Sequence, residues 1–120
     1  MASTTDRDAL VTLFRSARVA SWRKRENWDT DAALSTWFGV EVNGEGSVVR
    51  LDLPYNNLQG TIPAELGKLT ALLELYLNGN ELSGHIPPQL GDLGALKYLD
   101  LARNKLDAAT AIGAAGIRTA

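Results

Sequence analysis

The sequence contains no cysteine, and this absence restricts both its chemistry and its cellular compartment. Neither a cysteine nucleophile nor a disulfide can form. Small secreted domains usually depend on disulfides, so a cysteine-free chain of 120 residues favours a reducing compartment. The N-terminal residues lack the apolar stretch of a signal peptide, and no apolar run reaches the roughly eighteen residues that a membrane helix needs. We therefore expect a cytoplasmic protein without membrane contact, or the extracellular part of a receptor if the chain is a fragment.

Histidine is scarce as well, and neither sign of charge dominates. A single imidazole, His85, in a chain without cysteine is a poor basis for a zinc site or for catalysis. The net charge of -2 does not indicate nucleic-acid or membrane-surface binding. Arg23, Lys24 and Arg25 lie between two tryptophans, a combination that can bind nucleic acid, but residues 1–38 hold six basic and five acidic side chains. The glycine-containing segments match no complete phosphate-binding motif. We expect no catalysis, no cofactor, no metal and no nucleic-acid partner.

What the sequence does contain is a repeat with a period of 24 residues. Leu51, Leu75 and Leu99 are spaced by this interval, and aligning residues 49–72 with residues 73–96 gives twelve identical positions. Composition alone does not make half of a unit recur in register. The identical pairs are Leu51/Leu75, Leu53/Leu77, Asn56/Asn80, Leu58/Leu82, Gly60/Gly84, Ile62/Ile86, Pro63/Pro87, Leu66/Leu90, Gly67/Gly91, Leu69/Leu93, Ala71/Ala95 and Leu72/Leu96.

The first half of each unit predicts a short strand followed by a tight turn. In Leu51-Asp52-Leu53 the leucines alternate with a polar residue, so one face of the strand is buried. Asn56 falls where the chain leaves the strand, and its amide can bond backbone groups there. Because Asn recurs at this place in each unit, we expect the stacked side chains to form a ladder. Gly60 permits backbone angles that other residues resist.

The second half of each unit predicts a short helical turn on the other side of a coil. Pro63 suits the first turn of a helix because its φ angle is fixed. Leu66 and Leu69 then face inward at helical spacing, and Gly67 ends the turn. The same residue types recur 24 residues later. Each unit is therefore predicted to form one coil of a solenoid.

The complete motif resembles the plant-specific class of leucine-rich repeat (LRR). It runs from Leu72 to Pro87 and continues with Leu90-Gly91 and Leu93, and the resemblance covers about residues 48–107. This resemblance implies an α/β fold, an LRR solenoid built as a short right-handed stack of coils. It also implies an N-terminal helical cap and hairpin before the first coil.

The residues before the repeats resemble the N-terminal cap of plant LRR receptors. Asp6-Arg7-Asp8-Ala9-Leu10 matches the start of the cap helix, and Trp37-Phe38-Gly39-Val40 matches the Trp-x-Gly-Val segment that follows it. The cysteines that flank this segment in the family are Ser35 and Val42 here, so the usual cap disulfide is impossible. Cysteine-free caps of this kind are similar to those in LRR proteins of algae and other protists.

Local signals in this region agree with a helix and a hairpin. Asp6 or Asp8 can cap the helix, and Asn43-Gly44 predicts a turn between residues 40–42 and 47–49. One face of the helix carries the apolar residues Leu10, Leu13, Phe14 and Ala17. The predicted core anchors that close the first coil are Trp22, Trp28 and Trp37.

These patterns divide the chain into a capping region (1–47), the repeats (48–107) and an alanine-rich tail (108–120). The third unit keeps its strand, Leu99-Asp100-Leu101, but Ala108, Thr110, Ala111 and Ala114 stand where Gly60, Ile62, Pro63 and Leu66 would recur. We expect Asp107 to cap a short helix over residues 108–112. The second coil is then predicted to be under-covered at Leu82, Ile86, Leu90 and Leu93, which would allow self-association through this C-terminal edge.

The candidate site follows from the strand positions that are not leucine, because these positions line the concave face of a solenoid. At a spacing of 24 residues they form three rows across three coils. Tyr and Arg, which are enriched among binding hot spots, recur in these rows. The alternative is that these side chains only keep the surface soluble. The predicted partner-binding residues are Arg50, Asp52, Tyr55, Glu74, Tyr76, Tyr98, Asp100 and Arg103.

The function predicted from these features is a non-catalytic module that binds a protein or peptide partner through the concave face. The first alternative is a regulatory segment of a larger receptor kinase or GTPase, since LRRs precede such domains in the family. The second is a structural fragment that associates with itself.

Overall fold

The elements follow one another in the order that the 24-residue period predicts, and the computed structural model describes residues 4–107 of the chain. One α-helix comes first, and strands then alternate with 3₁₀ segments. The elements are α1 (Thr4–Ser16), η1 (Val19–Ser21), η2 (Leu34–Thr36), β1 (Val40–Val42), β2 (Val48–Asp52), β3 (Gln59–Thr61), η3 (Ala64–Lys68), β4 (Glu74–Tyr76), β5 (Glu81–Gly84), η4 (Pro88–Asp92), β6 (Tyr98–Asp100) and β7 (Lys105–Leu106).

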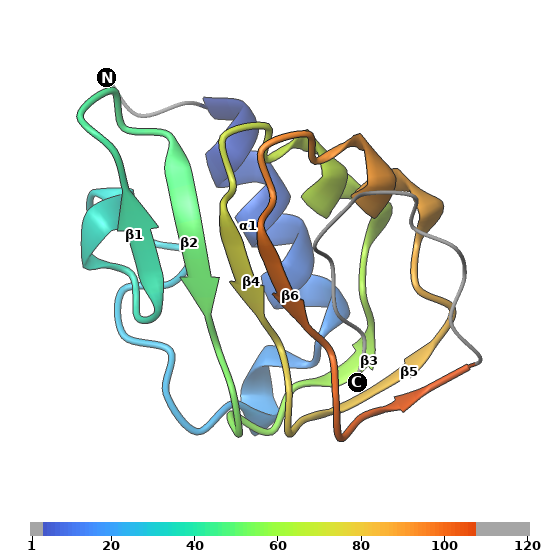
Figure 1. Ribbon diagram of the computed structural model, residues 1–120. Helices are drawn as coiled ribbons and strands as arrows, with labels where there is room; N and C mark the ends of the chain where they lie inside the picture. Colours follow the sequence, from blue (N-terminus) through green and yellow to red (C-terminus); the bar gives the residue numbers. More distant parts are fainter. Residues whose placement is uncertain (1–3, 108–120) are drawn as a thin grey trace.

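The coils stack so that each repeat contributes one strand to each of two sheets (Figure 1). Strands β1, β2, β4 and β6 form one sheet in that order, and β3, β5 and β7 form the other. The pairs β2–β4, β4–β6, β3–β5 and β5–β7 are parallel, as the repeat requires. The pair β1–β2 is antiparallel and is the hairpin predicted around Asn43. The side-chain oxygen of Asn43 closes this hairpin by accepting the backbone N–H groups of Glu45 and Ser47.

The strand register equals the sequence period, which confirms the alignment of the units. Leu51 pairs with Leu75, and Leu75 pairs with Leu99, across three adjacent strands. All three are buried, and so is Leu77, at 0% exposure, as predicted. Burying one leucine side chain stabilises a fold by about 1.5–3 kcal/mol. The leucine column is therefore the main source of cohesion between coils.

The second sheet was not predicted from the sequence. Strands β3, β5 and β7 contain few apolar residues, and Gly60 lies at the centre of β3. Their strand character comes from pairing between coils, for example Gln59 with Glu81. Two-residue alternation therefore gives no signal for them.

The predicted asparagine ladder is present. The side-chain oxygen of Asn80 accepts the N–H groups of Asn56 (2.9 Å) and Leu58 (3.0 Å) in the preceding coil. Its amide donates to the carbonyls of Leu53 and Leu77, both at 2.9 Å. Asn104 repeats the arrangement by accepting the N–H of Leu82 at 3.0 Å. Each amide thus serves the backbone of two coils.

Two details of the helical half-turn differ from the prediction. Pro63 and Pro87 do not lie inside a helical turn but directly before η3 and η4, with φ angles of -78° and -65°. Gly67 lies within η3 and does not end it. A Cβ atom on Gly67 would lie 2.5 Å from the backbone oxygen of Gln89. Gly67 is therefore needed for the close approach of η3 and η4, not for termination.

The N-terminal helix packs on the first coil and its apolar face is placed as predicted. Leu10, Leu13 and Ala17 are fully buried, while Phe14 is partly buried against tryptophans. The helix-capping role predicted for Asp6 or Asp8 is wrong, since α1 already begins at Thr4. The carboxylate of Asp6 is buried and instead accepts the N–H of Val48 at 2.8 Å. A first-strand N–H that faces no earlier coil needs such an acceptor.

The second coil is better covered than the sequence suggested. Leu82, Ile86, Leu90 and Leu93 are all buried, with exposures between 0% and 3%. For Leu82 the reason is visible, because β7 pairs with β5 and continues the third coil past Asn104. The predicted helix over residues 108–112 and the alanine-rich tail lie outside the described residues.

Candidate partner-binding face

The four-stranded sheet brings two of the predicted rows together on one face. Arg50, Glu74 and Tyr98 are register partners on β2, β4 and β6. Asp52, Tyr76 and Asp100 form the next row on the same three strands. Side chains two residues apart on a strand point to the same side. The two rows therefore share one face, opposite the buried leucines.

The third predicted row lies beyond the strands, in the turns. Tyr55, Gly79 and Arg103 all have positive φ angles, of 51°, 72° and 58°. The ring of Tyr55 lies over Gly79, because a Cβ atom added to Gly79 would be 2.4 Å from two ring carbons. This glycine leaves the space in which the tyrosine ring rests.

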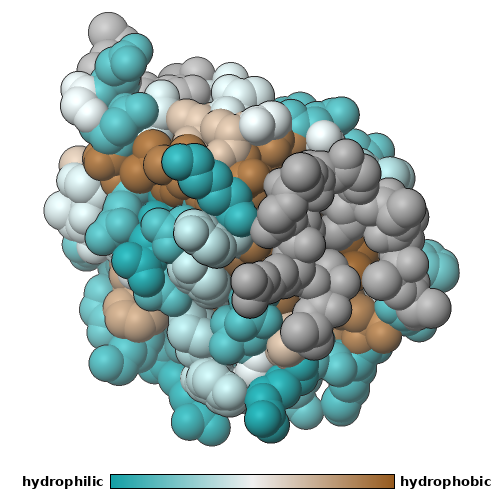
Figure 2. Space-filling model, viewed as in Figure 1, coloured by the Kyte–Doolittle hydropathy of each residue, from teal (hydrophilic) through white to brown (hydrophobic). Residues whose placement is uncertain are grey.

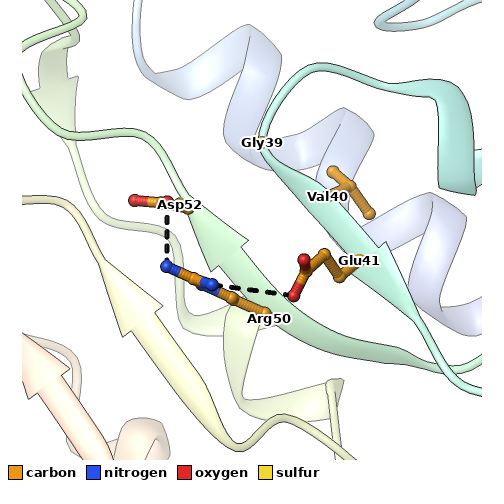
Figure 3. Close-up of a pocket in the computed structure, with 5 residues that line it drawn as sticks. All are labelled: Gly39, Val40, Glu41, Arg50 and Asp52. Carbon is orange, nitrogen blue, oxygen red and sulfur yellow. Dashed lines mark hydrogen bonds and ion pairs between the residues drawn. The ribbon is translucent and has the colours of Figure 1, made fainter.

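An ionic network occupies the β1–β2 side of the face (Figure 3). The guanidinium of Arg50 pairs with Asp52 at 3.2 Å and with Glu41 at 3.8 Å. These residues, with Gly39 and Val40, line a hollow of about 210 Å³. Glu41 was missed because β1 stands outside the repeat. The hairpin pairing of Glu41 with Arg50 is the signal that could have found it.

The centre of the face is held by a second set of contacts around Tyr76. The guanidinium carbon of Arg50 lies 5.5 Å from the centroid of the Tyr76 ring. The hydroxyl of Tyr76 donates a hydrogen bond to Glu74 at 2.6 Å. This hydrogen bond, with burial and the negative charge of Glu74, raises the pKa of Tyr76 to about 12. Tyr76 therefore stays a neutral donor at physiological pH.

Exposure is uneven across the predicted site. Tyr55 and Tyr98 are 57% and 53% exposed, and they are the exposed large hydrophobic side chains among residues 4–107. Arg103 is exposed as well. The remaining predicted residues are half-buried, so the patch is contiguous in register but not uniformly exposed; they are Arg50, Asp52, Glu74, Tyr76 and Asp100. Figure 2, in the same view as Figure 1, shows mostly hydrophilic and neutral side chains across the centre of the molecule.

Other chemistry-bearing residues lie away from this face. His85 is exposed and pairs with Asp107 at 3.1 Å, as expected for a solvated loop residue. Within the basic segment, Lys24 lies 5.5 Å from the ring centroid of Phe38. Among residues 4–107, no three His, Cys, Asp or Glu side chains gather closely enough to hold a metal ion. In the same part of the chain, no helix combines the length and apolar character needed to cross a bilayer.

The three-stranded sheet carries a second hollow that sequence reasoning did not find. It measures about 490 Å³ and is lined by Arg18, Gln59, Gly60, Glu81, Ser83 and Lys105. Its central carboxylate, Glu81, is already engaged by Lys105 and Gln59, both at 3.3 Å. This self-pairing leaves the hollow with less unpaired chemistry than the sheet face.

Sequence comparison places these coils beside plant proteins. Residues 46–106 match the family model described as "Leucine rich repeat". Leucine-rich repeat protein 1 of Arabidopsis thaliana is 43% identical over 72 residues, which are 58% of this chain and 33% of that protein. The chain thus spans about a third of the length of this relative.

Structural comparison points the same way. The Arabidopsis receptor kinase HAESA, solved with the peptide hormone IDA and the co-receptor SERK1, superposes with a TM-score of 0.82. It is 22% identical and the match covers 98% of this chain and 21% of that chain, a likeness of fold. The BIR3–SERK2 complex from Arabidopsis thaliana gives a TM-score of 0.64 and 33% identity, covering 82% of this chain and 57% of that chain.

Proposed function

Because this chain belongs to the leucine-rich repeat family, we propose that it is a non-catalytic recognition module that binds a protein or peptide partner across its four-stranded sheet. The observation that carries the proposal is the exposure of Tyr55 and Tyr98 on an otherwise polar face. Tyrosine offers a large apolar surface and a polar hydroxyl at low cost in side-chain entropy, which is why it is common in interfaces.

The backbone behind this face favours recognition without rearrangement. The asparagine ladder joins the turns at the ends of β2 and β4, and the Arg50 network joins β1 to β2. A preorganised surface loses less conformational entropy when a partner binds. We propose that the half-buried residues hold the face in shape, while Tyr55, Tyr98 and Arg103 contribute most of the contact.

The partner class and the location are proposed from the relatives. HAESA was solved with a peptide hormone and a co-receptor, and BIR3 with SERK2. These complexes support a protein or peptide as the partner here. The likeness to a receptor kinase supports the extracellular alternative over the cytoplasmic location expected from composition. It also keeps open the first alternative function, a segment of a larger receptor kinase or GTPase.

We propose that residues 1–47 act as a cap and residues 48–107 as a right-handed stack of repeats. Three indole N–H groups support a cap that holds together without a disulfide. Trp22, Trp28 and Trp37 donate to the carbonyls of Ala17, Phe38 and Ala32 at 2.8, 2.8 and 3.1 Å. Ser35 and Val42 stand where the family has cysteines. The similarity to algal and protist proteins belongs to the same proposal.

A peptide-display experiment tests the binding function. Random linear peptides displayed on phage are selected on the immobilised chain, and the affinities of the enriched peptides are measured by calorimetry. We expect the variant Tyr55→Ala/Tyr98→Ala to weaken binding more than about tenfold, because each tyrosine would be a hot spot. The melting temperature should stay within a few degrees of the parent.

The matched control is Glu65→Ala/Lys68→Ala, two exposed changes on η3, away from the strands. This control should leave affinity unchanged. Peptides that bind equally well to the tyrosine variant would contradict the proposal. Self-association, the second alternative, is checked by sedimentation over a range of concentrations, where a strictly monomeric chain would argue against it.

A further inference from the structure

The sheet face already accommodates one guanidinium, that of its own Arg50. This group lies over the Tyr76 ring, at 5.5 Å from the centroid. Asp52, two residues along the same strand, pairs with it at 3.2 Å, and Glu41 on the neighbouring strand pairs with it at 3.8 Å. The chain itself thus shows the groups that hold an arginine side chain on this surface: an aromatic ring and carboxylates from two strands.

The same kinds of group recur on the β6 side without a cation. Tyr98 offers an exposed ring, Asp100 lies two residues further along β6, and Glu74 is the register partner of Tyr98 on β4. Within residues 4–107, the ion pairs to Arg and Lys involve Asp29, Glu41, Asp52 and Glu81, and neither Glu74 nor Asp100 takes part. This side of the face therefore carries uncompensated negative charge beside an exposed ring.

Both carboxylates on the β6 side are oriented by hydrogen bonds. Glu74 accepts the hydroxyl of Tyr76 at 2.6 Å, and one oxygen of Asp100 accepts the N–H of Ala102 at 3.0 Å. Both residues are half-buried. Each carboxylate keeps acceptor capacity beyond its one bond, because two oxygens offer about four lone-pair positions. Fixed carboxylates lose little entropy when a donor arrives.

We propose that Tyr98, Glu74 and Asp100 form a subsite for an arginine side chain of the partner. The proposal rests on the proposed function and names the chemistry that this face selects. A planar guanidinium can stack on the Tyr98 ring and donate at the same time to carboxylates in different directions. An ammonium is a compact, strongly hydrated point charge and uses this arrangement less well, so arginine is preferred over lysine.

The peptides selected on the parent chain provide the probe. We expect them to be enriched in arginine. Replacing that arginine with citrulline, which keeps the shape and removes the charge, should weaken binding about tenfold, and lysine should fall between the two. Raising the salt concentration should weaken the arginine peptide more than the citrulline peptide, because exposed charge pairs are screened.

Isosteric variants locate the effect on the protein. Asp100→Asn and Glu74→Gln keep an oxygen that can accept the Ala102 N–H or the Tyr76 hydroxyl, and they remove only charge. Each should reduce the preference for arginine over citrulline several-fold, as should Tyr98→Leu, which keeps apolar bulk without the ring. Glu65→Gln on η3 is the matched control and should leave the preference intact. Unchanged melting temperatures would show that the variants remain folded.

Two outcomes separate the inference from the function on which it rests. Peptides that need Tyr55 and Tyr98 but tolerate citrulline without loss would overturn the arginine subsite and leave the binding function standing. Peptides that ignore both tyrosines would overturn the subsite and the proposed function together.

Discussion

Residues 4–47 and residues 48–107 build equally dry cores by different means. In the repeats, leucine meets leucine at a constant interval, and one asparagine contact recurs from coil to coil. In the N-terminal region, four aromatic rings pack edge-on, tilted or stacked, at centroid distances of 5.0 to 5.7 Å. Each of the three indoles donates to a different carbonyl. One region is held by a single interaction used repeatedly, and the other by interactions that each occur once.

The junction between the two regions shows how non-repeating residues imitate a missing coil. The backbone of Lys24 gives and takes hydrogen bonds with the Asn56 side chain, as the backbone of a preceding repeat would. Asp6 accepts the N–H of Val48 at the start of β2. A first coil has no neighbour on one side, so its backbone groups need partners from elsewhere. The N-terminal region supplies them.

The largest effect is expected where one residue has no copy elsewhere. Trp37 is 1% exposed, contacts Trp28 and lies under the guanidinium of Arg7, 5.2 Å from its ring centroid. Trp37→Ala should lower the free energy of unfolding by about 3–5 kcal/mol. Chemical denaturation followed by circular dichroism measures it. A loss below about 1 kcal/mol would mean that the aromatic cluster does not hold the N-terminal region.

A core leucine of the repeats should come next. Leu77 is fully buried between coils, and Leu77→Ala should cost about 2–5 kcal/mol. The half-buried Leu73, just before β4, is the matched control, and its truncation should cost clearly less. A melting temperature within about two degrees of the parent for Leu77→Ala would contradict the coil register.

The asparagine ladder should give a smaller loss that involves no apolar contact. Asn80→Ala leaves the N–H groups of Asn56 and Leu58 without their acceptor, at a cost of about 1–3 kcal/mol. Asn78→Ala keeps the backbone carbonyl that Tyr55 uses and should be nearly neutral. Equal effects of the two substitutions would remove the distinction between ladder and surface asparagines.

Glycine positions sharpen the same comparison between close-packed coils and the hairpin. Gly67→Ala would push a Cβ atom against the Gln89 backbone and should cost about 1–3 kcal/mol. A Cβ atom on Gly44, in the hairpin turn, would meet nothing within 4 Å. Gly44→Ala should therefore change stability by about 0.5 kcal/mol or less. Thermal melts of the two variants decide whether the η3–η4 approach is as tight as the geometry indicates.

The smallest effect concerns the sheet face at high pH. The pKa of Tyr76 is raised from 10.0 to about 12, so its neutral form is favoured in the folded state. The associated stability is fully present below pH 10 and is lost as the pH rises through about 12. The stability difference between the parent and Tyr76→Phe should therefore shrink across this window. In Glu74→Gln, tyrosinate absorbance should show Tyr76 titrating nearer its ordinary pKa, and an unchanged titration would contradict the Glu74 contact.

Much of the repeat region could be predicted because each of its positions is constrained twice, by local chemistry and by the residue 24 places away. The buried leucines, the ladder and the rows of the candidate face all follow from that constraint. Glu41 could not be found in this way, because it reaches Arg50 through a hairpin outside the period. The position of Gly67 was also misjudged, because its neighbour in space is Gln89 and not a residue of its own turn.

The sequence by itself determined the period, the identity of the buried faces and the absence of any disulfide, because these depend on residue type and spacing alone. Tertiary structure decided the rest: the second sheet, the charge pairing that neutralises Arg50, and the different exposures of Tyr76 and Tyr98. The physical reason is that backbone pairing in the polar strands and the fate of each surface charge depend on what the adjacent coil presents. That neighbour lies about 5 Å away in space but 24 residues away in the chain.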